Sequence, residues 1–315
     1  MNKSLLSAKY LLDAPKQKND ILIVKKEQHI ATGADSTAEI GACNKEIKQG
    51  SMVNGRLLSY VLLMLGTGGS GKTFLARLLA EYLLGKMAGR LRLIDADEPS
   101  KADLARLFDV AQVLRLVDRT DITKLFEVIR GAGAGITLVD VKADRQTEFR
   151  STATLSPQSV RLLKREGVQV IAFLPLIAAK AGSMSVVADW HQLLGPDAQY
   201  VLVANEVSGQ IDFDRLPEHL DRFVRDVHPS ILHLPKLEEE IAGELDRRNV
   251  RMLHLLRAAG YDGPGALPLL EGEDPVDDYG PSLSSPFNLP VVEDFWKQFH
   301  AEAEKVLVPL LGLES

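Results

Sequence analysis

A glycine-rich turn between an apolar run and a helical stripe constrains this chain more than any other feature. In YVLLMLGTGGSGKTFLARLLAEYLL, residues 60–84, the glycines at 66, 68 and 71 satisfy GxGxxG, the pattern of dinucleotide-binding turns. Residues 66–73 also satisfy GxxxxGK[ST], the P-loop pattern. Both patterns place a phosphate-binding turn between a strand and a helix. The type of phosphate ligand that the turn binds must therefore be inferred from the flanking residues.

The residues on each side of the turn match that context. Residues 58–65 form an unbroken apolar run, as expected for a strand buried on both faces. A helical stripe follows the turn, and we expect it to end near Gly85 and Gly89. It is made by Phe74, Leu75, Leu78, Leu79, Tyr82 and Leu83. A strand and an amphipathic helix at these places argue against an accidental match.

Strand-like and helix-like segments then alternate, which indicates a parallel sheet with crossover helices. Further strands are predicted at 91–95, 135–140, 168–176, 200–205 and 230–237. Helices are predicted at 156–165 and 185–194. The predicted fold class is α/β, of P-loop NTPase type, with a mostly parallel sheet and helices on both faces. An N-terminal arm and a C-terminal helix complete it.

The chain is predicted to have three parts. Residues 1–55 are a partly irregular arm, 56–259 the nucleotide-binding domain, and 260–315 a Gly/Pro-rich segment with a final helix at about 291–311. Apolar side chains at helical spacing on that helix predict that it docks on the protein body. They are Val292, Phe295, Trp296, Phe299, Leu307 and Leu310. The alternative is a helix that binds a partner or a membrane, which the interleaved acids Glu293, Asp294, Glu302 and Glu304 disfavour.

Composition excludes several classes of protein. The net charge of -6 argues against a surface built to bind nucleic acid, although a local basic patch stays open. Cys43 is the only cysteine, so no internal disulfide forms, which fits a reducing compartment. The longest nearly apolar run, 168–179, is too short to cross a bilayer, so we expect a cytoplasmic protein. The histidines lack the spacing of a zinc site, and no GxSxG elbow occurs.

Two observations favour the P-loop over a dinucleotide site. Lys72 supplies an ammonium that can reach the β and γ phosphates, and Thr73 offers a hydroxyl to Mg²⁺. Asp95 lies at a suitable distance to bind a ribose, but Asp97 adds a second carboxylate where a dinucleotide site needs one. The residues expected to bind nucleotide are Gly66, Thr67, Gly68, Gly69, Ser70, Gly71, Lys72 and Thr73.

Polar side chains follow the predicted strands at Asp95, Asp97, Asp140 and Asn205, where ligands bind in open α/β sheets. Asp140 fits a Walker B carboxylate that accepts hydrogen bonds from Mg²⁺-bound water and from Thr73. Asp97 can orient the attacking water, with a helix cap as the alternative. The predicted metal-site residues are Thr73, Asp95 and Asp140, and the predicted catalytic residues are Lys72 and Asp97.

Five segments in this order resemble the ParA/MinD family of deviant P-loop ATPases, within the wider group that includes dethiobiotin synthetase and the cobyrinate amidases. They are GTGGSGKT, LIDADEP, GITLVD, VIAFLPL and VLVANEV, and the match runs from about residue 57 to about 260. The resemblance implies ATP and Mg²⁺ as ligands. It also implies that Lys72 and Thr73 bind phosphate and metal, that Asp97 is the hydrolytic carboxylate and that Asn205 contacts adenine.

The chain departs from the family pattern at two places. Thr67 stands where ParA and MinD proteins carry a lysine that reaches the partner's phosphates in a dimer, so a homodimer of that kind is left open. After Asp140 the chain continues VKADRQTEF in place of a phosphate-sensing glycine. Lys142 or Arg145 is the hypothetical replacement, in contact with phosphate or with a second substrate.

The first functional hypothesis is an ATP-binding, slowly hydrolysing switch, in plasmid or DNA partition or a mobile-element process, with a protein partner. The basic cluster to consider for DNA is Arg247, Arg248, Arg251 and Arg257, although interleaved acids favour a solvated face. The alternative is a metabolic enzyme or kinase in which ATP activates a second substrate held by residues 140–150 and by the long Gly/Pro-rich tail. A third hypothesis is a nucleotide-binding scaffold with impaired hydrolysis.

Overall fold

The structure is a computed structural model. It describes residues 52–53, 56–57, 59–87, 90–96, 103–114, 119–130, 135–141, 156–264, 283 and 288–313. All of them belong to the compact unit Gln49–Ser315. The predictions for residues 1–51 and for the Gly/Pro-rich residues 265–282 lie outside the described residues, and the predicted domain boundaries stay predictions.

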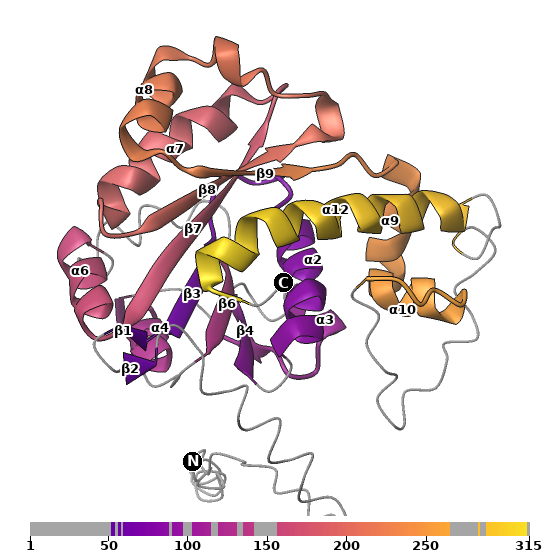
Figure 1. Ribbon diagram of the computed structural model, residues 1–315, viewed down its shortest axis with the longest axis horizontal. Helices are drawn as coiled ribbons and strands as arrows, with labels where there is room; N and C mark the ends of the chain where they lie inside the picture. The colour runs from indigo at the N-terminus through magenta and orange to yellow at the C-terminus, as the bar shows by residue number, and fades with distance from the viewer. Residues whose placement is uncertain are drawn as a thin grey trace, which may run out of the picture. The chain divides into compact units, whose positions relative to one another are not determined.

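A parallel sheet of seven strands forms the centre of this unit, in the order β5-β4-β6-β3-β7-β8-β9 (Figure 1). The strands are β3 (Ser59–Met64), β4 (Leu91–Ala96), β5 (Gln112–Val113), β6 (Ile136–Val141), β7 (Val168–Ile177), β8 (Gln199–Asn205) and β9 (Ser230–Leu234). The glycine-rich turn leaves β3, which lies between β6 and β7. The turn is therefore placed at the carboxyl end of the central strand.

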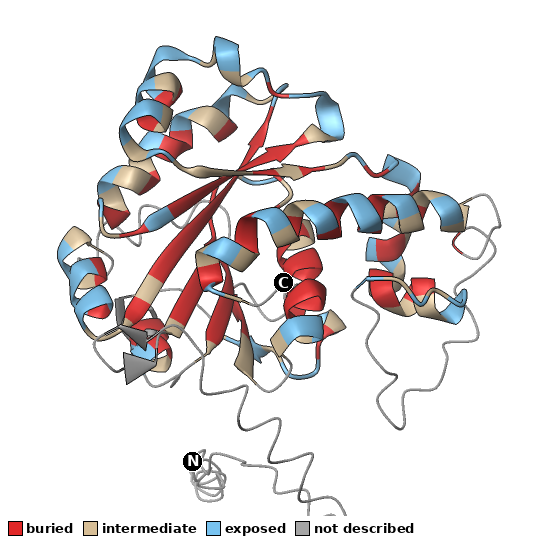
Figure 2. Cartoon of the chain, in the orientation of Figure 1, coloured by how far each residue is buried: buried red, intermediate tan, exposed pale blue. Residues whose placement is uncertain are grey.

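Helices cover both faces of the sheet, as the sequence predicts. One face packs against α2 (Lys72–Met87), α3 (Asp103–Leu107), α9 (Glu239–Arg248), α10 (Met252–Ala258) and α12 (Asn288–Leu311). The other packs against α4 (Arg119–Arg130), α6 (Pro157–Arg165), α7 (Ala181–Leu194) and α8 (Glu218–Val227). Figure 2 shows the buried residues gathered on the strands and on the helix sides that face them. Two short 3-10 helices, η4 (Glu206–Ser208) and η5 (Phe213–Arg215), follow β8.

The central strand is buried on both faces because its side chains alternate between two apolar cores. Leu62 and Met64 join the core under α2 and α12. Val61 and Leu63 join the core under α4, α6 and α7. The unbroken apolar run of this segment is thus explained by its central place in the sheet.

The six predicted strands are all present, and the differences concern short elements, helix ends and the helices α4 and α8, which the sequence analysis did not predict. The sequence analysis missed the edge strand β5 and the antiparallel pair β1 (Met52–Val53) and β2 (Arg56–Leu57). Helix α2 ends at Met87, between Gly85 and Gly89, where the sequence predicts its end. In its last turn Lys86 pairs with Glu304 of α12 at 2.6 Å.

The docking of the C-terminal helix is confirmed. The side chains of Val292, Phe295 and Phe299 are buried in the core that also contains α2 and β9. Trp296 is fully buried as well, and its Nε1 donates to the carbonyl of Pro264 at 2.9 Å. Within the described part of the chain, none of the helices combines the length and the apolar character needed to span a bilayer.

Candidate functional site

The turn between β3 and α2 has the backbone geometry of a phosphate-binding loop. Gly66, Gly69 and Gly71 have φ values of 133°, 65° and 89°, in the region that favours glycine. A Cβ on Gly71 would lie 2.5 Å from Nδ2 of Asn205, so this position has no room for a side chain. The strand, glycine turn and helix predicted from the sequence are all confirmed.

Lys72 begins α2 and directs its ammonium into the loop. Its side chain is buried, and Nζ donates to the carbonyl of Thr67 at 2.8 Å. Ser70 is fully buried, and its Oγ donates to the same carbonyl at 2.8 Å. The loop therefore folds around a cation at the amino end of α2, where the helix dipole adds positive potential.

Asn205 braces the loop from the end of β8. Its Nδ2 donates to the carbonyl of Ser70 at 3.1 Å, and its Oδ1 accepts from the N–H of Val207 at 3.2 Å. The sequence analysis placed Asn205 at the adenine through resemblance alone. That contact stays a prediction, and the contact with the loop is an addition to it.

Asp95 and Asp140 lie side by side, and Asp140 is on the strand next to β3. They are paired residues of β4 and β6, and Asp140 is also paired with Met64, the last residue of β3. Both carboxylates are buried. Oδ2 of Asp95 accepts from the N–H groups of Leu104 at 2.8 Å and Ala105 at 3.1 Å, so this carboxylate caps α3. The sequence analysis considered such a cap for Asp97 only.

The residues present fit a magnesium ion that arrives with a nucleotide. Thr73, Asp95 and Asp140 offer oxygen atoms, the ligands that Mg²⁺ prefers. Among the described residues, no group of three or more His, Cys, Asp or Glu side chains could hold a metal ion by itself. Mg²⁺ is commonly held by one or two carboxylates together with substrate phosphates. When bound, it would supply charge neutralisation to the phosphates.

Several predicted positions cannot be placed. Asp97, the predicted hydrolytic carboxylate, lies outside the described residues, as do Lys142 and Arg145. Their roles stay predictions. The same holds for the second-substrate site proposed for residues 140–150, of which only Asp140 and Val141 are described.

One residue at the loop was missed by the sequence analysis. Lys180 lies between β7 and α7, and its Nζ donates to the carbonyl of Gly68, a residue 112 positions earlier. No motif or periodicity in the sequence marks this lysine. Only the folded sheet brings the β7–α7 turn beside the glycine loop.

Two arginines of the cluster on α9 and α10 share one carboxylate partner. Glu244 accepts hydrogen bonds from both Arg247 and Arg248, and these guanidinium groups lower the pKa of Glu244 to about 2. Arg251 contacts His254 and lies 5.7 Å from the ring centroid of Phe108. These contacts support the solvated-face interpretation over a DNA-binding patch.

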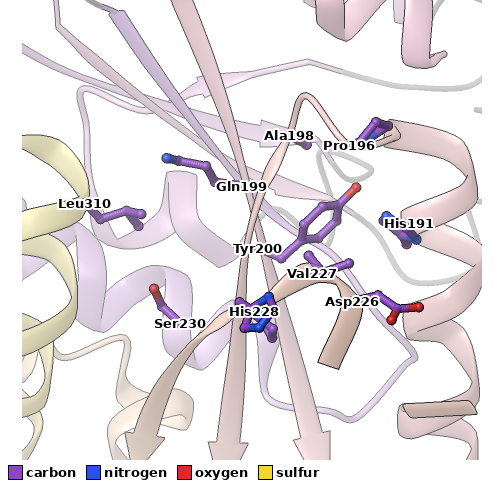
Figure 3. Close-up of a pocket in the computed structure, with 11 residues that line it drawn as sticks. His191, Pro196, Ala198, Gln199, Tyr200, Asp226, Val227, His228, Ser230 and Leu310 are labelled. Carbon is purple, nitrogen blue, oxygen red and sulfur yellow. The ribbon is translucent and has the colours of Figure 1, made fainter. Parts of the chain in front are cut away.

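A separate pocket of about 480 Å³ lies at the amino ends of strands β8 and β9, away from the glycine loop (Figure 3). Its lining includes Gln199 and Ser230, the first residues of β8 and β9, together with His191, Tyr200 and His228. Ligands of open α/β sheets bind at the carboxyl ends of the strands, and this pocket lies at the amino ends. The glycine loop, not this pocket, is therefore the candidate nucleotide site.

Comparisons with known proteins give structural likeness only. No protein-family model and no curated protein matches the sequence. The MinC:MinD cell division protein complex of Aquifex aeolicus superposes with a TM-score of 0.39 at 12% identity, over 77% of this chain and 96% of that chain. FlhF complexed with GMPPNP and Mg²⁺ superposes with a TM-score of 0.32 at 15% identity, over 64% of this chain and 76% of that chain.

FtsY from Mycoplasma mycoides gives a TM-score of 0.29 at 13% identity, over 53% of this chain and 60% of that chain. Scores this low carry no activity or partner over to the present chain. What the molecule itself shows is an α/β fold of P-loop NTPase type, with a parallel sheet, helices on both faces and a docked C-terminal helix.

Proposed function

We propose that this chain binds Mg²⁺-ATP at residues 66–73 and hydrolyses it slowly, as a nucleotide-dependent switch. The observation that carries the proposal is the Lys72 ammonium held inside a glycine loop at the carboxyl end of the central strand. Backbone amides and the dipole of α2 favour a phosphate there. Two buried carboxylates, Asp140 on β6 beside the central strand and Asp95 on β4 beyond it, support a Mg²⁺ ion at this end of the sheet.

The same geometry disfavours a dinucleotide. A dinucleotide turn has no use for an ammonium inside the loop, whereas the terminal phosphates of a triphosphate require one. The choice of ATP, the hydrolytic role of Asp97 and the adenine contact of Asn205 come from the resemblance to ParA/MinD ATPases and are part of the proposal. A protein partner that recognises the nucleotide state is also part of it.

The test is a binding panel of ATP, ADP, GTP and NAD, each with Mg²⁺, read by thermal unfolding. A ligand at 100 times its Kd stabilises a protein by about 2.7 kcal/mol, which raises the unfolding midpoint by several degrees. We expect ATP to do this for the natural chain and to lose most of the effect with Lys72→Ala.

The matched control is Lys164→Ala, an exposed lysine on α6 whose Nζ pairs with Asp197 at 3.3 Å. It should respond to ATP as the natural chain does. A midpoint that rises with NAD and not with ATP would overturn the proposal, as would an ATP response that survives Lys72→Ala.

Phosphate release then distinguishes the functional classes. We expect slow release by the natural chain, and binding without release by Asp97→Ala. Binding with no release under any addition would favour a scaffold. Release that begins only when a small molecule is added would favour the metabolic enzyme or kinase.

A further inference from the structure

A second lysine approaches the glycine loop from the turn between β7 and α7. Lys180 precedes α7, and its Nζ donates to the carbonyl of Gly68. A Cβ built on Gly69 would lie 3.6 Å from the same Nζ. The ammonium therefore lies against two successive residues of the loop.

The turn that carries Lys180 is held in place by a hydrogen-bond network. The N–H of Lys180 donates to the carbonyl of Ile177 at 3.0 Å, and the N–H of Ser183 donates to the carbonyl of Lys180 at 2.8 Å. The hydroxyl of Ser183, which is fully buried, accepts from the N–H of Ile177 at 3.0 Å. The backbone of Lys180 is thus fixed beside the loop, and only its side chain has to move to meet a ligand.

The two lysines lie at the same end of the loop. Lys72 donates to the carbonyl of Thr67 and Lys180 to that of Gly68, the next residue. In a P-loop the lysine of the GK pair reaches the β and γ phosphates. An ammonium at the adjacent carbonyl therefore lies in the same part of the loop as the lysine that is expected to reach the terminal phosphates.

We propose that Lys180 is a second phosphate-binding residue, which contacts the terminal phosphate of a nucleoside triphosphate and so favours triphosphate over diphosphate. This inference rests on the proposed nucleotide site. A phosphate oxygen is charged and a carbonyl is neutral, and hydrogen bonds between charged groups are the stronger ones. The ammonium exchanges the Gly68 carbonyl for the phosphate when the triphosphate binds.

The alternative is that Lys180 only stabilises the conformation of the loop. Such a structural role would affect every ligand of the loop, so removing the lysine side chain would weaken ATP and ADP binding by the same factor. A contact with the terminal phosphate would weaken ATP binding alone. The ratio of the two affinities therefore separates the roles.

The experiment measures the Kd values of Mg²⁺-ATP and Mg²⁺-ADP by calorimetry for the natural chain, Lys180→Ala, Lys180→Arg and the control Lys164→Ala. Hydrogen bonds to charged groups suggest a loss of roughly 10- to 100-fold in ATP affinity for Lys180→Ala. ADP affinity should change less than about threefold. Lys180→Arg keeps the charge and should recover most of the ATP affinity.

Equal losses for ATP and ADP, or no loss for either, would overturn the inference while leaving the nucleotide site intact. Failure of the natural chain to bind either nucleotide would instead overturn the proposed function, and the inference with it. Far-ultraviolet circular dichroism of each variant confirms that the chain is folded in every comparison.

Discussion

A methyl group on Gly71 would lie 2.5 Å from Nδ2 of Asn205, which itself donates to the carbonyl of Ser70. The last glycine of the loop thus has two requirements at once, a φ of 89° and an empty side-chain position. The first comes from the tight turn and the second from the brace at the end of β8. The first is local to the motif, and the second follows from the position of β8, which the motif alone does not show.

Gly71→Ala should therefore disturb the site by displacing Asn205, which hydrogen-bonds to the loop. We expect a loss of about 1–3 kcal/mol in the free energy of unfolding, because alanine is strained at this φ and displaces Asn205. Nucleotide affinity should fall as well. Urea unfolding and calorimetry measure the two effects.

Gly182→Ala is the matched control. That glycine lies in the first turn of α7, and a Cβ there would meet no atom within 4 Å. It should leave stability and affinity unchanged or slightly improved. Equal unfolding free energies and equal nucleotide affinities for the two variants would show that the contact with Asn205 does not constrain the loop.

The residues of the site divide according to how far the sequence could predict them. The glycines and Lys72 follow from a motif whose spacing reflects local backbone geometry. Asp140 follows from its position at the end of an apolar strand. The contacts of Lys180 and Asn205 depend on which strands are neighbours, and strand order is not written in any local pattern.

At the scale of elements, helix α2 supplies the cap of helix α10. Glu81, in the middle of α2, accepts hydrogen bonds from the N–H groups of Met252 at 3.0 Å and Leu253 at 2.7 Å. Burial raises the pKa of Glu81 from 4.5 to about 7, although the two amides, Arg251 and Arg77 lower it. The helix that begins with the phosphate loop is thus joined to α10 through a carboxyl group that titrates near neutrality.

Replacing Glu81 with glutamine should change how stability depends on pH. Because the folded-state pKa is the higher one, the contribution of Glu81 is fully present below about pH 4.5 and is lost as pH rises through about 7. The free energy of unfolding of Glu81→Gln, relative to the natural chain, should rise by roughly 3 kcal/mol between pH 4.5 and 8.

Urea unfolding at a series of pH values measures this difference. Glu127→Gln, at an exposed position on α4, is the control and should show no such trend. A relative stability of Glu81→Gln that stays constant or falls over this pH range would refute the raised pKa.

The strands that the sequence predicts are the long ones, whereas two helices of ordinary length, α4 with 12 residues and α8 with 10, were not predicted. Apolar runs such as residues 168–176 indicate strands because burial on both faces leaves no polar position. Helix α3 has 5 residues and strand β5 has 2, too few for a period to be recognised. Helix α7 begins at Ala181, four residues before the predicted start at 185, because the Ser183 network closes its first turn.

At the scale of the whole described unit, the sheet joins two cores into one structure. Each central strand contributes alternate side chains to both, so neither core can loosen without disturbing the strands between them. The two tryptophans of the chain lie in different cores. Trp190 of α7 packs on one face of the sheet and Trp296 of α12 on the other, and both are fully buried.

These two side chains test whether the C-terminal helix unfolds together with the nucleotide-binding sheet. Trp190→Phe leaves Trp296 as the fluorescent probe, and Trp296→Phe leaves Trp190. We expect each variant to give the same urea midpoint by fluorescence and by far-ultraviolet circular dichroism, because coincident transitions mark a single cooperative unit. An earlier fluorescence transition in Trp190→Phe would instead show that α12 detaches before the sheet unfolds, and it would make the docked helix a separable part of the switch.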